Sequence, residues 1–440
     1  MKQLYIHPLF FKLLSVVGGF FLVSFFVSWL YIVSLALLIG LLLALCVDIF
    51  MLYSAKNRIK ASRVLPEKLS NGDENPIIIR VKSKYRVPVR IRLIDEIPFQ
   101  YQKRDFLMES QLQPHAEKEF RYTLRPVNRG EYRFGKLNVY ALTPLRLAMR
   151  RYVFCNNATV AAYPSFIQMQ KYDMMAFSHH LVEYGLKKIR RIGHTMEFEQ
   201  IKEYVSGDDV RTINWKATSK KGQLMINQYQ EEKSQPVYQI IDKGRSMQMP
   251  FNKMSLLDYA INTTLAVSNI VIKKQDKAGM FTFSKKVENR IVADRKAGHM
   301  QKIMEALYPI DTNFDESDFS RLYADIRQTI TQRSLMMVYT NFETMDALNR
   351  QLPYLKAIAR NHLLIVIFFD NTELNQLIDR ESRNVQDIYD KIIAEKFAFE
   401  KRLIVRELTK HGIQSILTQP ENLTLDSINK YLELKARGMI

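Results

Sequence analysis

Residues 240–247 read IIDKGRSM: a run of branched apolar residues ends at an aspartate, and a serine follows four residues later. Carboxylate and hydroxyl oxygens are the hard ligands that Mg²⁺ takes in proteins, so Asp242 and Ser246 could hold a divalent cation. Lys243 and Arg245 flank the aspartate, and a unit positive charge at about 4 Å opposes a cation by about 1 kcal/mol in water and about 4 kcal/mol near a protein surface. The stretch therefore has ligand oxygens in an unfavourable electrostatic setting.

The region around this stretch, residues 236–440, predicts strands that alternate with helices. Apolar runs of strand length lie at 238–241, 279–283, 289–293, 334–340, 362–369 and 414–418. Amphipathic helical patterns lie at 256–274, 299–307, 319–330, 345–360, near 384–411 and at 427–437. This alternation indicates an α/β doubly wound domain with a mostly parallel sheet. Such sheets bind ligands at the carboxyl ends of strands, which is where IIDKGRSM lies.

Residues 65–165, which precede the α/β region, have a different pattern of apolar residues. A basic stretch at 54–64 comes before them, and we interpret it as a linker. Short alternating runs lie at 77–83, 89–95, 118–124 and 136–142, and turn-forming residues separate them. This pattern predicts a small antiparallel β-sandwich.

The N-terminal region, residues 1–55, is strongly apolar. From Leu9 to Tyr53 only Lys12 and Asp48 are charged. A bilayer core about 30 Å thick needs about 20 helical residues, so the stretch predicts a transmembrane helical hairpin with a tight turn near Ser28 and Trp29. One long tilted span or an uncleaved signal anchor is the alternative.

Charge and cysteine content predict the compartment. The chain has a formal net charge of +19 and two cysteines, and basic residues flank both ends of the apolar region. Positive flanks favour the cytoplasmic side, which predicts a bacterial inner membrane protein with cytoplasmic soluble domains. The basic clusters 187–191 and 220–221 are short and lack an aromatic stacking repeat, which argues against nucleic acid. Attraction to the anionic inner leaflet is a sufficient explanation of the charge, and solvated charge without a partner is the alternative.

A longer motif lies between the two soluble domains. Residues 191–232 combine a Gly-rich entry, Glu-Phe, Tyr, Gly-Asp, Arg-x-Ile-x-Trp and a final Glu, at Gly193, Glu197, Phe198, Tyr204, Gly207, Asp208, Arg211, Ile213, Trp215 and Glu232. In this the chain resembles the membrane-anchored proteins that carry domain of unknown function 58. The resemblance implies that residues 236–440 form a von Willebrand factor type A-like domain. We expect the segment 166–235 to clamp the two domains together, and a partner-binding surface is the alternative.

The resemblance also gives a pattern against which the metal-site residues can be compared. Many type A domains carry Asp-x-Ser-x-Ser after the first strand and an Asp after a later strand. Here Asp242 and Ser246 fit, whereas Gly244 replaces the first Ser and Asn341 replaces the later Asp. One hydroxyl and one negative charge are missing, which predicts a degenerate site without a cofactor, with Mg²⁺ or Mn²⁺ as the alternative. We expect Asp242 to pair with Arg245 or Lys243 instead.

Other candidate chemistry is sparse. No nucleotide-binding glycine loop, metalloprotease motif or nucleophile elbow occurs. His179 and His180 are neighbours without a nearby Cys and are interpreted as surface residues. An acidic loop could add an oxygen to the site through Thr312, Asp315, Glu316 or Asp318, and the alternative is that its acids favour the start of the helix that follows.

These observations favour a non-enzymatic, membrane-anchored interaction module or adaptor. By resemblance, its partner is a MoxR-type AAA+ ATPase that assists the assembly or maturation of other proteins. A metal-assisted hydrolase centred on Asp242 is the second hypothesis. A basic surface that binds anionic lipid or nucleic acid is the third.

Overall fold

A computed structural model of the chain describes residues 3–54, 58–103, 106–155, 157–177, 197–206, 208, 210–230, 234–312, 314–381 and 384–440. The chain divides into two compact units, Met1–Tyr163 and Pro164–Ile440, which are described separately below.

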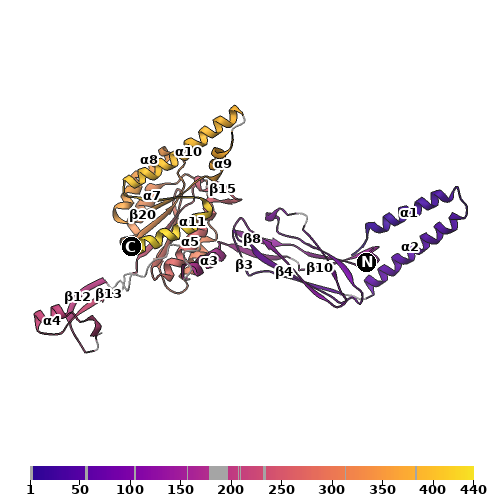
Figure 1. Cartoon of the computed structure of the whole chain (residues 1–440), viewed down its shortest axis with the longest axis horizontal. Helices are drawn as coiled ribbons and strands as arrows, with labels where there is room; N and C mark the ends of the chain where they lie inside the picture. Colours follow the sequence, from indigo (N-terminus) through magenta and orange to yellow (C-terminus); the bar gives the residue numbers. More distant parts are fainter. Residues whose placement is uncertain are drawn as a thin grey trace. The chain divides into compact units, whose positions relative to one another are not determined.

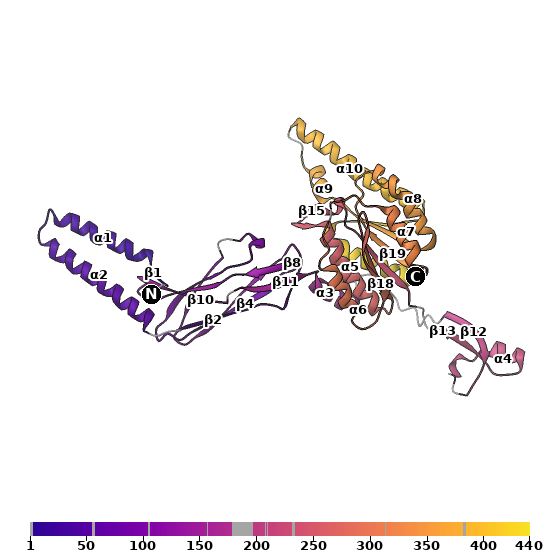
Figure 2. The same cartoon turned by 180° about the vertical axis from the view of Figure 1, so that it is seen from behind.

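Two apolar helices open the first unit. Helix α1 (Pro8–Ser24) and helix α2 (Leu30–Tyr53) lie side by side and are joined by a short turn (Figures 1 and 2). Helix α2 is long and apolar enough to cross a membrane, whereas α1 is shorter, and α2 is the single helix of that length and composition in the described part of the chain. The predicted hairpin is therefore present as a pair of helices, and a crossing by both stays a prediction.

The base of this hairpin is bound to the adjoining β-sheet. Strand β1 (Leu4–Ile6), which precedes α1, pairs with β10 (Ala148–Phe154). On α2, the fully buried Asp48 accepts hydrogen bonds from the backbone N–H groups of Leu147 and Ala148, both at 2.8 Å, and from the hydroxyl of Thr143. A buried carboxylate needs such donors, so Asp48 ties α2 to the turn before β10.

The rest of the first unit is a β-domain built from three small sheets. Their strand orders are β1-β10-β9-β5-β6, β2-β4-β7 and β3-β11-β8. The strands are β2 (Ile59–Val64), β3 (Lys68–Ser70), β4 (Asn75–Ser83), β5 (Val89–Asp95), β6 (Leu107–Leu112), β7 (Glu117–Leu124), β8 (Gly130–Phe134), β9 (Leu137–Leu142) and β11 (Ala158–Tyr163). The four predicted strands correspond to β4, β5, β7 and β9. All pairs are antiparallel except β3 with β11.

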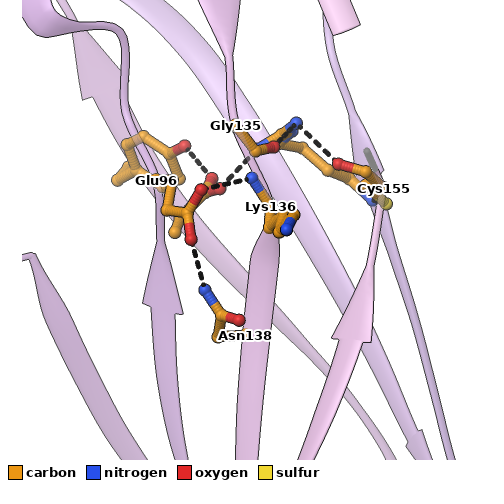
Figure 3. Close-up of polar contacts among 8 residues, drawn as sticks. Glu96, Gly135, Lys136, Asn138 and Cys155 are labelled. Atoms are coloured by element: carbon orange, nitrogen blue, oxygen red, sulfur yellow. Dashed lines mark hydrogen bonds and ion pairs between the residues drawn. The ribbon is translucent and has the colours of Figure 1, made fainter. Parts of the chain in front are cut away.

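The linker expected at residues 54–64 is wrong for its second half, because Ile59–Val64 forms β2. Its basic residues conceal an alternation in which Ile59 is buried at 1% exposure. Arg63 points inward to the buried Asp95, and it also donates to the carbonyls of Gly135, at 2.9 Å, and Cys155, at 3.4 Å (Figure 3). Ion pairing inside the domain, which composition does not reveal, makes this basic segment part of the fold.

The second unit contains a six-stranded sheet in the order β18-β17-β14-β19-β20-β21. The strands are β14 (Pro236–Asp242), β17 (Lys277–Phe283), β18 (Val287–Asp294), β19 (Leu335–Tyr339), β20 (Leu363–Phe369) and β21 (Gln414–Thr418). All neighbours are parallel except β17 with the edge strand β18. The predicted mostly parallel sheet is present, and each of the six strands was expected from its apolar run.

Helices cover both faces of this sheet (Figures 1 and 2). One face packs against α5 (Leu256–Lys273), α6 (His299–Leu307) and α11 (Leu423–Ala436), and the other against α7 (Phe319–Thr329), α8 (Met345–Asn361) and α10 (Val385–Lys410). Helix α3 (Phe166–Phe177) packs on α5, and the short helix α9 (Thr372–Asp379), which the sequence did not predict, lies beside α10. The two buried apolar layers confirm the doubly wound architecture.

A small element lies within the signature segment. Strands β12 (Glu197–Glu203) and β13 (Met225–Gln230) form a hairpin that carries a turn of 3-10 helix, Val210–Thr212, and the short helix α4 (Trp215–Lys221). The expected positions Gly193, Gly207 and Glu232, the histidines 179 and 180 and the cluster 187–191 lie outside the described residues. The expected clamp between the domains stays a prediction.

Candidate functional site

The candidate site lies where the strand order of the six-stranded sheet reverses. Strand β14 has β17 on one side and β19 on the other, both parallel to it. The chain runs from β14 outward to β17 and β18 and then returns to the other side of β14 at β19. This is the topological switch point at which open α/β sheets form a crevice. Asp242 is the last residue of β14 and lies at its carboxyl end.

The Asp242 carboxylate is almost fully buried, at 1% exposure, and neutral groups surround it. It accepts hydrogen bonds from the backbone N–H of Gly244 at 2.8 Å, from Thr340 Oγ1 at 2.7 Å and from the hydroxyl of Ser317. Burial raises its pKa, and the hydrogen bonds from Ser317, Thr340 and Gly244 offset only part of that effect. No cation of the described residues acts on this carboxyl group, which is held by neutral donors alone.

The expected pairing of Asp242 with a flanking cation is wrong. Lys243 forms an ion pair with Glu288, and Arg245 is exposed and lines the neighbouring cleft. Successive residues after a strand point in different directions, so adjacency in the sequence did not bring these cations to Asp242.

The lack of space for a side chain, and not the backbone conformation, accounts for the glycine at position 244. Its φ is −70°, which any residue adopts, but a Cβ there would overlap Ser317 Oγ and would lie 3.1 Å from Asp242 Oδ1. The absence of a side chain lets the Ser317 hydroxyl approach Asp242. The hydroxyl that the sequence pattern lacks at position 244 is thus supplied to Asp242 by a residue far along the chain.

Asn341 is also occupied by a partner within the protein. Its Oδ1 accepts a hydrogen bond of 2.7 Å from Nζ of Lys401 on α10, and both residues are buried, at 6% and 8% exposure. Burial lowers the pKa of the Lys401 amine to about 8, while Glu343 and Asp370 act in the opposite direction. The Lys401 amine accordingly binds the side-chain oxygen of the residue that stands where the pattern would place a metal-binding carboxylate.

Two cavities open beside these residues. A polar cleft of about 480 Å³ is lined by Asp242, Ser246, Ser317, Thr340 and Asn341, together with Arg245 and Arg350. A second, more apolar cavity of about 330 Å³ is lined by Asn341, Lys401, Phe251, Phe369, Leu374 and Phe397. Asn341 borders both cavities, so the Asn341–Lys401 pair lies between a polar and an apolar recess.

The donor set does not fit a divalent cation. Mg²⁺ requires several oxygens in a near-octahedral shell, and Asp242 already accepts three hydrogen bonds, while Asn341 faces an ammonium group. Ser246 borders the cleft but is a single hydroxyl. Among the described residues no cluster of three His, Cys, Asp or Glu side chains is arranged to hold a metal.

The acidic loop contributes to the site through a residue that sequence reasoning missed. Ser317 lies within the loop and binds Asp242, whereas Asp318 caps α7 by accepting from the N–H groups of Ser320 and Arg321 at 2.9 and 3.1 Å. The helix-start interpretation thus holds for Asp318. Thr340 and Lys401 were missed as well: Thr340 precedes the named Asn341, whereas nothing local distinguishes Lys401 from other lysines of its helix.

The described part of the signature segment has a structural explanation for several of its residues. Asp208 accepts from the Val205 N–H at 3.0 Å and from Lys202 Nζ at 3.1 Å, and these two bonds lower its pKa. Tyr204 donates its backbone N–H to Leu224 at 2.8 Å. Trp215 begins α4 with 70% of its surface exposed, as an interface residue would be. Glu197 and Phe198 lie in β12 and Arg211 in the 3-10 turn.

Part of this chain is similar to a known protein family. The model described as "Protein of unknown function DUF58" matches residues 200–393. The match covers a little under half of the chain. The resemblance drawn from residues 191–232 is thereby confirmed for the part that the match covers, which runs from β12 through the loops of the site and into α10.

A curated relative is the "Uncharacterized protein YeaD" of Bacillus subtilis (strain 168), which is 22% identical over 166 residues. The match covers 37% of this chain and 39% of that protein, so the chain spans well under half of the relative's length.

Two solved structures are similar to a little under half of the chain. The conserved hypothetical protein BatB from Bacteroides thetaiotaomicron is 11% identical, with a TM-score of 0.31, and covers 46% of this chain and 100% of its own. An aerotolerance-related membrane protein from Bacteroides fragilis NCTC 9343 is 13% identical, with a TM-score of 0.30, and covers 47% and 100%. At these TM-scores neither likeness assigns a fold or a function to this chain.

Proposed function

We propose that this protein is a membrane-anchored interaction module that presents the carboxyl edge of its six-stranded sheet to a partner protein without using a metal ion. The anchor is the helical hairpin α1–α2, and the soluble domains lie on the cytoplasmic side of a bacterial inner membrane. The α/β domain is of the von Willebrand factor type A kind with a degenerate metal site.

The observation that carries this proposal is the internal satisfaction of the site. Asp242 is held by Ser317, Thr340 and Gly244, and Asn341 is held by Lys401. The edge therefore needs no ion to be a stable polar surface, and the cleft of about 480 Å³ beside it stays open to a side chain of another protein. Interfaces of this kind use exposed Arg residues as anchors, and Arg350 lines the cleft.

The partner that we propose is a MoxR-type AAA+ ATPase, for which this protein acts as an adaptor in the assembly or maturation of other proteins. A hydrolytic function has less support, because the named ligand Asp242 accepts hydrogen bonds from neutral donors and the side-chain oxygen of Asn341 accepts one from the internal amine of Lys401.

Site-directed photocrosslinking in intact cells tests the proposal. A photoreactive residue at Arg350, beside the cleft, is expected to crosslink to the ATPase. The same residue at Arg327, exposed in the last turn of α7, is the matched control and is expected to give little product. Equal crosslinking at both positions, or none at Arg350 in intact membranes, would contradict the proposed surface.

Two further measurements test the anchor and the metal. Residues 65–440 are expected to be digested by protease in inside-out vesicles, and protection would place them in the other compartment. Millimolar Mg²⁺ or Mn²⁺ is expected to leave the thermal midpoint of the full chain in detergent unchanged. A rise in the midpoint that Asp242→Ala abolishes would show that the site binds a cation.

A further inference from the structure

A basic recess lies at the base of the hairpin, on the β-domain. The recess has a volume of about 360 Å³ and is lined by Pro88, Arg90, Glu109, Ser110, Gln111, Thr143, Pro144 and Arg146. Arg90 and Arg92 lie two residues apart on β5, and both pair with Glu109 on β6, at 2.8 and 2.7 Å. Two guanidinium groups share a single carboxylate, so the recess keeps an excess of positive charge.

Arg146 adds a third guanidinium to this group. Its side chain is exposed, in the turn between β9 and β10, and it makes no ion pair with a described residue. His7, just before α1, lies close to the same three arginines: burial and then Arg92, Arg146 and Arg90 lower its pKa. Glu109 opposes this effect, so the charges that surround the recess act on the residue that precedes α1.

The hairpin geometry sets the depth of the recess relative to a bilayer. Residues 30–47 of α2 span about 27 Å at 1.5 Å per residue, close to the roughly 30 Å of a hydrocarbon core. Asp48 follows at once, and it is hydrogen bonded to Thr143 and to the N–H groups of Leu147 and Ala148. The turn that carries Arg146 is therefore fastened to α2 at the one charged residue of that helix, near its C-terminal end.

The contacts at the start of α1 indicate the same depth of the recess relative to the bilayer. The backbone N–H of His7 donates to the carbonyl of Leu147 at 2.8 Å, so α1 begins beside the same turn. Around it, Tyr5, Ile6 and Leu145 are each exposed at 41%, although they are apolar or aromatic. Aromatic and apolar side chains next to arginines are typical of the interface between headgroups and acyl chains.

We propose that Arg90, Arg146 and the Thr143 turn form a binding site for the phosphate of an anionic lipid headgroup. Guanidinium groups bind phosphate oxygens through paired N–H donors, and Arg146 has its donors available for this. The inference rests on the proposed membrane anchoring, and it adds a lipid class and a site to it. It also gives part of the net charge of +19 a specific role.

The test uses the full chain purified in detergent. Phosphatidylglycerol, phosphatidylcholine and inorganic phosphate are titrated separately, and bound lipid is counted by native mass spectrometry. We expect saturable binding of phosphatidylglycerol and much weaker binding of the other two. Arg146→Gln is expected to weaken phosphatidylglycerol binding by about fivefold, the effect of one basic side chain near a membrane surface.

The matched control is Arg133→Gln on β8, in another sheet of the same domain, whose side chain is 79% exposed. It is expected to bind lipid like the wild type. Arg90→Gln should also weaken binding, and because it breaks the pair with Glu109 its thermal midpoint is measured in parallel. Arg146 has no such partner to lose, so its variant reports on lipid without a folding defect.

The outcomes separate this site from the anchor. Equal binding by the wild type, Arg146→Gln and Arg133→Gln would overturn the site, and inorganic phosphate that binds as tightly as phosphatidylglycerol would overturn its assignment to lipid. If cell fractionation finds the chain in the membrane while the lipid test fails, the anchor stands and only this inference falls. If the chain is absent from the membrane fraction, both fall.

Discussion

Two buried aspartates, Asp95 in the β-domain and Asp242 in the α/β domain, are stabilised in different ways. They are exposed by 2% and 1%. Asp95 pairs with the buried Arg63 and accepts a hydrogen bond of 2.5 Å from the Tyr122 hydroxyl, whereas Asp242 is surrounded by neutral donors. Burial raises the pKa of both carboxyls, and a cation opposes this effect only at Asp95.

This difference in partners distinguishes the Asp95 cluster, which has a structural role, from the Asp242 region, which can bind a partner protein. The donors of Arg63 are directed at Asp95 and at the carbonyls of Gly135 and Cys155, and next to this cluster Glu96 accepts from the Lys136 N–H and from Asn138 at 2.8 and 3.0 Å (Figure 3). Asp242 instead borders an open cleft. The Arg63–Asp95 pair is enclosed, with both side chains at 1% exposure or less, whereas the hydroxyl residues that hold Asp242 also line the cleft.

The largest expected effect comes from breaking the ion pair in the β-domain. Arg63→Met leaves the Asp95 carboxylate buried without its cation, which should lower the free energy of unfolding by about 3–5 kcal/mol. Chemical denaturation of the full chain in detergent measures this. Arg80→Met, which breaks the exposed pair with Glu119, is the control and should cost less than about 1 kcal/mol. Equal losses of unfolding free energy in the two variants would show that the buried Arg63–Asp95 pair contributes no more than an exposed pair.

The second effect concerns the buried cation at the sheet edge and depends on pH. The pKa of Lys401 falls from its ordinary value of 10.5 to about 8 in the folded state. Between these values the unfolded chain binds more protons than the folded chain, so the wild type should gain about 3 kcal/mol over Lys401→Met as the pH rises through this window. Lys410→Met removes an exposed lysine of the same helix and is the matched control. A difference that stays constant with pH would contradict the burial of the Lys401 charge.

The third prediction is that replacing the Asp242 carboxyl by an amide destabilises the protein less than removing the side-chain acceptor altogether. Asp242→Ala leaves the donors of Ser317, Thr340 and Gly244 without an acceptor and should cost about 2–3 kcal/mol, whereas Asp242→Asn keeps an acceptor and should cost about 1 kcal/mol or less. Because the folded pKa of Asp242 is raised above 3.8, the wild type should lose stability relative to Asp242→Asn as the pH rises through that range. Equal costs for the two variants would mean that the charge itself is required.

The smallest effect tests the fit between Gly244 and Ser317. Gly244→Ala should cost about 1–2 kcal/mol, because the new Cβ overlaps Ser317 Oγ. Adding Ser317→Ala removes the overlapping atom and should recover most of the loss, which a double-mutant cycle measures. A cost that is unchanged by the second substitution would place the strain elsewhere.

Sequence periodicity predicted the strands of the six-stranded sheet, and the position of Asp242 at the carboxyl end of β14 followed from that prediction. Tertiary partners were predicted less well. Arg245 and Lys243, next to Asp242 in the chain, were expected to bind it, whereas its partners come from Ser317 and Thr340, on segments that the fold brings to the same edge. The linker expected at 54–64 fails for the same reason, since residues 59–64 pair with β4 as strand β2 and Arg63 binds Asp95.

The sequence by itself determined the apolar hairpin, the β-rich region, the alternating α/β region and the loss of a hydroxyl and a carboxylate from the metal-site pattern. These properties depend on hydrophobic period, turn residues and residue identity, which are local. Only the tertiary structure decided that Ser317 supplies a hydroxyl to Asp242, that Lys401 donates a hydrogen bond to Asn341 and that Arg90 and Arg146 meet at the base of the hairpin. Those contacts join residues far apart in the chain, and a pattern along the chain does not contain the distances between them.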